Sequence, residues 1–201
     1  MIAKITHGRS AARALAYDHG PGRADEHVNP RKVAGNVAGR DWRGRAQRMQ
    51  RFVNAHQHEA GDRGVYRVAL ANPTTDRVLS DREWRQVAER FVARFGADKG
   101  LWEATRHDRH HIHLTISKDR FDGTRMSTSH DYRRVAAICR ELEREHGLTN
   151  AAERRGSGRV RADTEATRRG DPQPDRDWLR VTIGRVLGEG GGTRLPCPGP
   201  A

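Results

Sequence analysis

Apolar side chains recur every three or four residues along much of the chain, the spacing that gives a helix one hydrophobic face. The expected helices span residues 10–17, 43–58, 80–96 and 131–146. The third is the most sharply bounded. Ser80 and Glu83 form a capping-box pair at its start, and Gly96 stands where a C-terminal cap belongs.

Other segments are short, rich in β-branched residues and partly alternating, which predicts strands. These strands are expected at 2–5, 65–70, 101–106 and 111–121. Asp122-Gly123 is a hairpin turn signal that leads into TRMS, and residues 18–40 are expected to form a long polar connection. The order of the elements predicts an α+β domain, with helices packed on a mostly antiparallel central sheet.

The composition changes near residue 150, because large apolar residues become rare over 151–174. We therefore predict one compact domain over 1–150 and a basic, largely disordered tail over 151–201. A single short helix is expected within the tail at 175–187.

The chain carries 38 Lys and Arg against 26 Asp and Glu, a formal net charge of +12 at pH 7. Such a surplus predicts a polyanionic partner, and Arg suits bidentate contacts with phosphates. A genome rich in G and C would also favour Arg over Lys, but it does not explain the surplus over acids. A single-strand DNA channel is expected along 31–51, although each cation there could equally belong to a solvated helix face. The candidates are Arg31, Lys32, Arg43, Arg45, Arg48 and Arg51.

The two cysteines fit neither a metal motif nor a disulfide framework. No segment approaches the roughly 20 apolar residues of a membrane span, and the N-terminus lacks the apolar core of a signal peptide. These features predict a soluble, cytoplasmic protein without membrane insertion.

The stretch RHDRHHIHLTISKDR, residues 106–120, contains four histidines within seven positions. On a strand, His111 and His113 share a face, and a short turn can fold His107 back beside them. Three neutral imidazoles could hold one divalent ion with a position left open, as in catalytic sites. Asp108 either orients one imidazole or is simply a turn residue. The alternative is that the histidines are exposed by chance on a basic protein.

A metal ion on a basic protein suits phosphodiester cleavage, with water or a tyrosine as the nucleophile. The chain has three tyrosines. Tyr66 is expected in the core, and Tyr132 is expected to cap a helix face or touch DNA. Tyr17 ends a short helix just before a Gly-Pro-Gly break, which leaves its hydroxyl free to reach a cleft.

The ordered set of these features resembles the mobilisation-type relaxases, nucleases of the His-hydrophobic-His superfamily. The matching regions are the opening MIAKI, the early Tyr17, the helix in VLSDREWRQVAERFV, the His-x-His strand and the helix in SHDYRRVAAICRELEREHGL. They cover most of residues 1–150. The resemblance implies a His-hydrophobic-His nuclease fold and a site- and strand-specific DNA nickase.

By that resemblance, Tyr17 is the nucleophile that forms a 5′ phosphotyrosine at an origin of transfer on a plasmid or integrative element. His107, His111 and His113 then hold one divalent metal ion, with Mg or Mn favoured over Zn. The implied partners are single-stranded DNA, a relaxosome accessory protein and a coupling protein. The alternatives are a non-catalytic origin-binding remnant, a hydrolase that uses water, and a related replication-initiator or transposase-type nickase.

Overall fold

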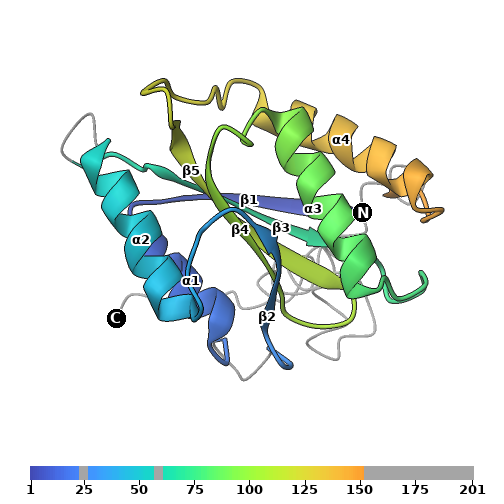
Figure 1. Cartoon of the computed structure of the whole chain (residues 1–201). Helices are drawn as coiled ribbons and strands as arrows, with labels where there is room; N and C mark the ends of the chain where they lie inside the picture. The colour runs from blue at the N-terminus through green and yellow to red at the C-terminus, as the bar shows by residue number, and fades with distance from the viewer. Residues whose placement is uncertain (23–26, 57–60, 152–201) are drawn as a thin grey trace, which may run out of the picture. The chain divides into compact units, whose positions relative to one another are not determined.

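The computed structural model describes residues 1–22, 27–56 and 61–151, which form nine elements (Figure 1). In chain order they are β1 (Ile2–Gly8), α1 (Ala11–His19), β2 (Arg31–Gly35), α2 (Trp42–Ala55), β3 (Val65–Ala71), α3 (Asp81–Phe95), β4 (Gly100–Arg106), β5 (His111–Arg120) and α4 (Asp131–Glu145). The expected tail and its helix at 175–187 lie outside the described residues.

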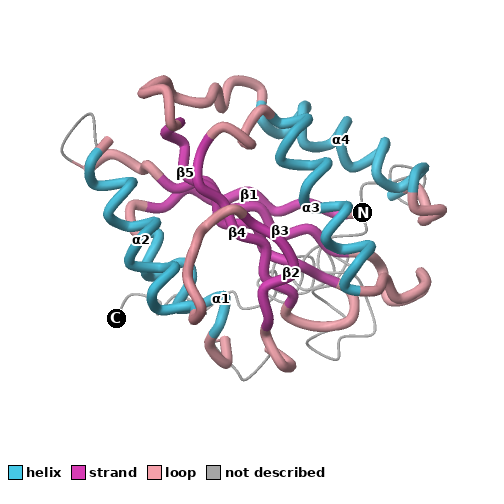
Figure 2. Tube along the Cα trace, viewed as in Figure 1, coloured by secondary structure: helices cyan, strands magenta, loops and turns pink. Residues whose placement is uncertain are grey.

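The five strands form one antiparallel sheet in the order β1-β3-β5-β4-β2 (Figure 2). Helices α3 and α4 pack on one face, while α1 and α2 pack together on the other. The α+β architecture predicted from the sequence is confirmed. Within the described residues, no helix is both long enough and apolar enough to cross a bilayer.

The larger core lies between the sheet and helices α3 and α4. Trp84, Phe91 and Phe95 of α3 are fully or almost fully buried against the strands. Each such side chain contributes about 1.5–3 kcal/mol when it is removed from water. The capping box of Ser80 and Glu83 is present, and Gly96 ends the helix with a φ of 76°. This helix therefore begins and ends where the sequence predicts.

Among the described residues, helices cover only part of the second face of the sheet. Alternate residues of each strand point to this face, and Val65 and Leu101 pack there beneath α1 and α2. Towards β1 the same face carries Lys4, Thr6 and Arg67, which line an open cavity. This half-covered, polar face holds the candidate site described below.

One expectation from the sequence is wrong. The connection predicted over 18–40 contains strand β2, which pairs with β4 and buries Val33 and Ala34 against the core. Its pattern is weak because charged and small residues surround a very short apolar pair. The predicted hairpin turn at Asp122-Gly123 is confirmed: Gly123 has a φ of 78°, and the TRMS segment returns beside β5 with an antiparallel bridge between Asp119 and Arg125.

Candidate active site

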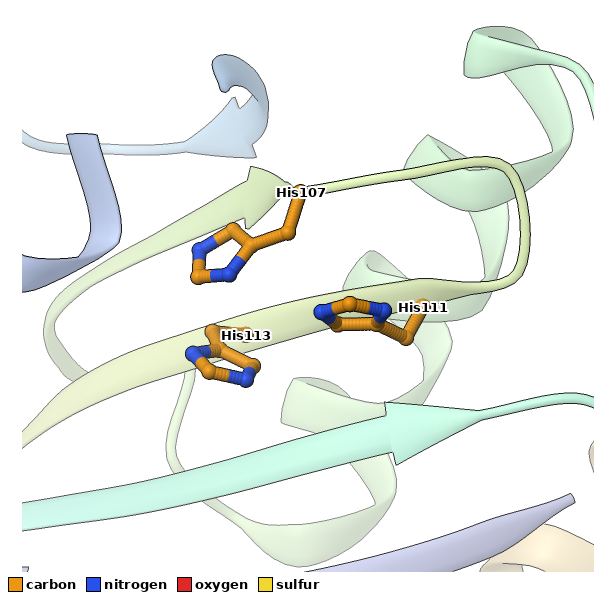
Figure 3. A group of neighbouring side chains, drawn as sticks. All are labelled: His107, His111 and His113. Carbon is orange, nitrogen blue, oxygen red and sulfur yellow. The ribbon is translucent and has the colours of Figure 1, made fainter. Parts of the chain in front are cut away.

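The three predicted histidines meet at the hairpin between β4 and β5 (Figure 3). His111 and His113 are alternate residues of β5, so they share a face. Strand β4 ends just before His107, whose backbone N–H donates to the carbonyl of His111 at 3.3 Å. One ring nitrogen from each histidine lies within 4.8 Å of the other two. The arrangement could hold a metal ion.

His107 is the most enclosed of the three. Its residue surface is 0% exposed, and neither ring nitrogen has a hydrogen-bond partner in the part of the chain that the structure describes. Burial, together with the nearby His113, lowers the pKa of His107 to about 2. A buried polar atom without a partner costs about 1–3 kcal/mol, and a neutral imidazole is the form that binds metal. The donor set therefore fits a divalent cation.

Carboxylates contact the other two histidines. Asp108 Oδ2 lies 2.7 Å from His111 Nδ1, and Asp108 Oδ1 accepts from the backbone N–H groups of His110 and His111 at 2.6 and 2.9 Å. Asp108 therefore does both things that the sequence offered as alternatives: it contacts the His111 ring, and it accepts hydrogen bonds from the backbone of the turn. Burial lowers the pKa of His111 despite the Asp108 charge.

Asp18 is a buried carboxylate of the site that the sequence analysis missed. His113 Nδ1 lies 3.1 Å from Asp18 Oδ1, and Thr115 Oγ1 donates to Oδ2 at 2.7 Å. Because a carboxylate only accepts, Nδ1 of His113 donates and Nε2 keeps its lone pair. Burial raises the pKa of the Asp18 carboxyl, but these hydrogen bonds and the charge of Arg67 lower it more, so it lies below its ordinary value.

Tyr17 lies beside the histidines. Its ring centroid is 6.1 Å from that of His113, in a stacked orientation, and 6.3 Å from that of His107. Tyr66 is fully buried in the core, as expected, and its hydroxyl donates to Asp131 at 3.4 Å. Tyr132 is 71% exposed on α4, on the opposite face of the sheet. Of the three tyrosines, Tyr17 is the one that contacts the histidine group.

His27 is a second neighbour that the sequence analysis missed. Its ring centroid lies 3.8 Å from that of His107 and 4.8 Å from that of Tyr17. The N–H of Val28 donates to the carbonyl of His107 at 2.8 Å, and His27 Nδ1 lies 2.8 Å from the carbonyl of Gly20. These bonds hold His27 and Val28 against the histidine group. A lone histidine in a polar segment gives no pattern that would reveal this.

A family model described as "Relaxase: MobA/VirD2-like, nuclease domain" matches residues 21–148, more than half of the chain. The chain belongs to this family. The matched range contains all three histidines, and Tyr17 lies just before it. Membership gives the relaxase domain a DNA-nicking function in general terms and implies binding to single-stranded DNA. The comparison with curated proteins found no match.

Next to Tyr17, the relaxase domain has a basic cavity of about 910 Å³. Arg9 precedes α1, Arg13 lies on α1, Lys4 lies on β1 and Arg67 on β3, and all four line the cavity together with His113. Thr6 and Ala69 contribute small polar and apolar surface to the same cavity. None of the six cations predicted to bind DNA is among the lining residues.

One of those six predictions is wrong. Arg45 is buried, and its guanidinium bonds Glu103 with distances of 2.6 Å from Nε and 3.1 Å from Nη2. His19 Nε2 lies 2.7 Å from the same carboxylate. Arg45 faces inward because it stands on the buried side of α2 beside Ala46 and Met49. It cannot contact DNA without breaking this pair.

The other five predicted cations remain accessible to differing degrees. Arg31 pairs with Asp81 at 2.8 Å, and Lys32 Nζ donates to the carbonyl of Val37 at 3.1 Å. Arg43, Arg48 and Arg51 are exposed on α2. The Arg43 guanidinium lies 4.6 Å from the Trp42 ring centroid.

Proposed function

We propose that this chain is a metal-dependent relaxase that nicks one DNA strand at an origin of transfer. In this proposal Tyr17 forms a covalent 5′ phosphotyrosine, which starts mobilisation of a plasmid or integrative element. The observation that carries it is the position of Tyr17, with its ring 6.1 Å from His113 and beside the histidine group. A tyrosyl ester conserves the energy of the phosphodiester for later rejoining.

His107, His111 and His113 would hold one divalent ion, with Mg or Mn favoured in use and Zn also compatible with imidazole ligands. When bound, the ion would polarise a phosphate oxygen and fix the orientation of the phosphate. Two carboxylates of the chain would fix the orientation of the imidazole rings: Asp108 orients His111, and Asp18 orients His113. Both carboxylates leave Nε2 of their histidine free.

The bond changes fall on Tyr17 and the phosphodiester. The phenol loses its proton to solvent, and its oxygen forms a bond to phosphorus. The bond from phosphorus to the 3′ oxygen breaks, and that oxygen takes a proton to become a free 3′ hydroxyl. Asp18 follows Tyr17 directly and is anchored to Thr115 of β5, so the tyrosine is held at the sheet.

Single-stranded DNA would enter through the basic cavity. Lys4, Arg9 and Arg13 would contact its phosphates near Tyr17, while the exposed Arg43, Arg48 and Arg51 on α2 would act at longer range. Accessory and coupling proteins would complete the complex in the cytoplasm. The catalytic domain would span 1–150, with 151–201 as a tail.

Covalent trapping tests the proposal. The protein is incubated with Mn²⁺ or Mg²⁺ and labelled single strands tiled across the DNA that flanks its gene. We expect a denaturant-resistant protein–DNA band, and peptide mass spectrometry should place the phosphate on Tyr17. Tyr17→Phe and His111→Ala should lose the band. Tyr132→Phe, the matched control at the exposed tyrosine, should keep it.

Other outcomes would select an alternative. DNA binding without any adduct would favour the non-catalytic remnant. Cleavage retained by Tyr17→Phe would favour a hydrolase that uses water. An adduct formed at a replication origin or an element end, rather than at an origin of transfer, would favour the initiator or transposase class.

A further inference from the structure

Arg67 lies at the centre of the open sheet face. In the strand register it stands between Thr6 of β1 and Thr115 of β5. Side chains that point to the same face of neighbouring strands form a row across the sheet. Arg67 therefore projects into the space between Asp18 and the basic cavity, which it lines together with Tyr17 and His113.

The contacts of Arg67 fix one side of its guanidinium group. Nη2 donates to Asp18 Oδ1 and lies 3.4 Å from His113 Nδ1. The guanidinium carbon lies 5.4 Å from the centroid of the Tyr17 ring. The cation is thereby placed beside the proposed nucleophile and a proposed metal ligand at once.

The other side of the guanidinium group is unused. Within the described residues, Asp18 is the hydrogen-bond acceptor of the guanidinium group, through Nη2, and Nε is buried without a partner. The Arg67 side chain is 23% exposed, while Asp18 is 0% exposed. Buried donors in native proteins are almost always paired, so the guanidinium group retains capacity for a further acceptor. A phosphate oxygen is the acceptor that suits a guanidinium best.

We propose that Arg67 is a catalytic residue, which binds a non-bridging oxygen of the phosphate attacked by Tyr17. This inference rests on the proposed function. Attack by the phenolate oxygen adds one negative charge to the phosphate before the 3′ oxygen departs with the electron pair of its bond. A guanidinium already held in place by Asp18 stabilises that added charge without reorganising. Arg67 neither gains nor loses a proton.

Lys4, Arg9 and Arg13 line the same cavity, whereas Arg67 is the cation that pairs with Asp18 and lies over the Tyr17 ring. Those three cations would attract the DNA backbone electrostatically, without contact with the reacting phosphate. Arg67 is held beside Tyr17 and His113, and the phosphate that Tyr17 attacks must bind next to these residues, which is why we assign Arg67 the chemical step.

A charge-neutral substrate provides the test. The rate of single-turnover adduct formation is measured on the oligonucleotide identified by covalent trapping. It is measured once with the normal scissile phosphodiester and once with a methylphosphonate at that position, in which a methyl group replaces one non-bridging oxygen. On the phosphodiester, Arg67→Ala should slow the bound reaction roughly 10²-fold. On the methylphosphonate, wild type and Arg67→Ala should differ by less than about fivefold, because this substrate carries one negative charge fewer before and during the attack and leaves Arg67 less charge to stabilise.

Arg67→Lys keeps a cation beside Asp18. It should fall between wild type and Arg67→Ala on the phosphodiester. If the alanine variant is unfolded, the rates of Arg67→Lys on the two substrates are compared with those of wild type instead. Arg90→Ala removes an arginine that pairs with Glu145 on the opposite face and should match wild type on both substrates. Thermal unfolding and Mn²⁺ binding verify that each variant retains the site.

Equal losses on the two substrates would overturn the role of Arg67 and leave the relaxase proposal standing. A wild-type chain that forms no adduct with any strand would overturn the proposed function and this inference together. The two failures are therefore distinguishable in one set of reactions.

Discussion

Asp18 Oδ1 lies 3.1 Å from Nδ1 of His113, although the two residues are 95 positions apart in the chain. Asp18 follows Tyr17 in sequence and accepts from Thr115, two residues beyond His113 on β5. One carboxylate therefore joins the helix that carries the proposed nucleophile to the strand that carries two proposed metal ligands. Its loss should disturb both.

Asp18→Asn should weaken Mn²⁺ binding by roughly 10–100-fold, the range seen when an outer carboxylate of a metal ligand is removed. Asn keeps the volume but is a poorer acceptor for the imidazole N–H. Titration calorimetry with Mn²⁺ measures the change. Asp122→Asn is the control, because Asp122 lies in an exposed turn and bonds only Thr124 among the described residues. Equal affinities for the two variants would contradict the prediction.

The metal-free protein should lose stability in acid because of His107. Burial lowers the pKa of His107 to about 2, from an ordinary value of 6.5. Below pH 6.5 the unfolded chain binds a proton at this residue that the folded chain does not, so the free energy of unfolding falls as the pH falls. The slope from this group approaches about 1.4 kcal/mol per pH unit.

Urea unfolding in the presence of a chelator, from pH 7 to pH 4, measures that slope. His107→Leu should flatten it. His130→Asn is the control, since His130 is exposed and its φ of 51° is one that Asn also adopts. A slope that is unchanged in His107→Leu would show that other groups dominate the acid response.

Glu103→Gln should destabilise the fold by about 3–5 kcal/mol, because it leaves Arg45 buried without its charge partner. His19, two residues after Tyr17, also loses its contact at 2.7 Å. Chemical denaturation at pH 7 measures the loss. Glu145→Gln, on the partly exposed pairs with Arg90 and Arg94, should cost under about 1 kcal/mol. A similar cost in both variants would argue against a role for the buried pair.

Lys4→Ala and Arg13→Ala should each lower the salt dependence of single-strand binding. Each lost phosphate contact reduces the log–log slope by about 0.7. Fluorescence anisotropy at several salt concentrations measures the slope. Arg82→Ala removes an exposed cation on α3, on the opposite face, and should leave the slope unchanged. A larger effect from Arg48→Ala than from Lys4→Ala would move the DNA path towards α2.

The sequence by itself determined the features that depend on residues close together in the chain. Helical spacing and the capping box gave α3, because the bonds that close a helix join residues four apart. Strand alternation put His111 and His113 on one face, and the short turn brought His107 beside them. The helix break just after Tyr17 and the resemblance to the relaxases together indicate Tyr17 as the nucleophile, and this role stays a prediction.

The tertiary structure decided what depends on distant pairs. Arg67 and Asp18 are 49 residues apart, and Arg45 and Glu103 are 58 apart. Neither pair leaves a periodic signal, so the sequence assigned Arg45 to the DNA surface and overlooked Asp18, His27 and Arg67. Whether an arginine meets a carboxylate or solvent is set by the packing of α1 and α2 on the sheet. Burial then fixes its role, since a buried charge must be paired.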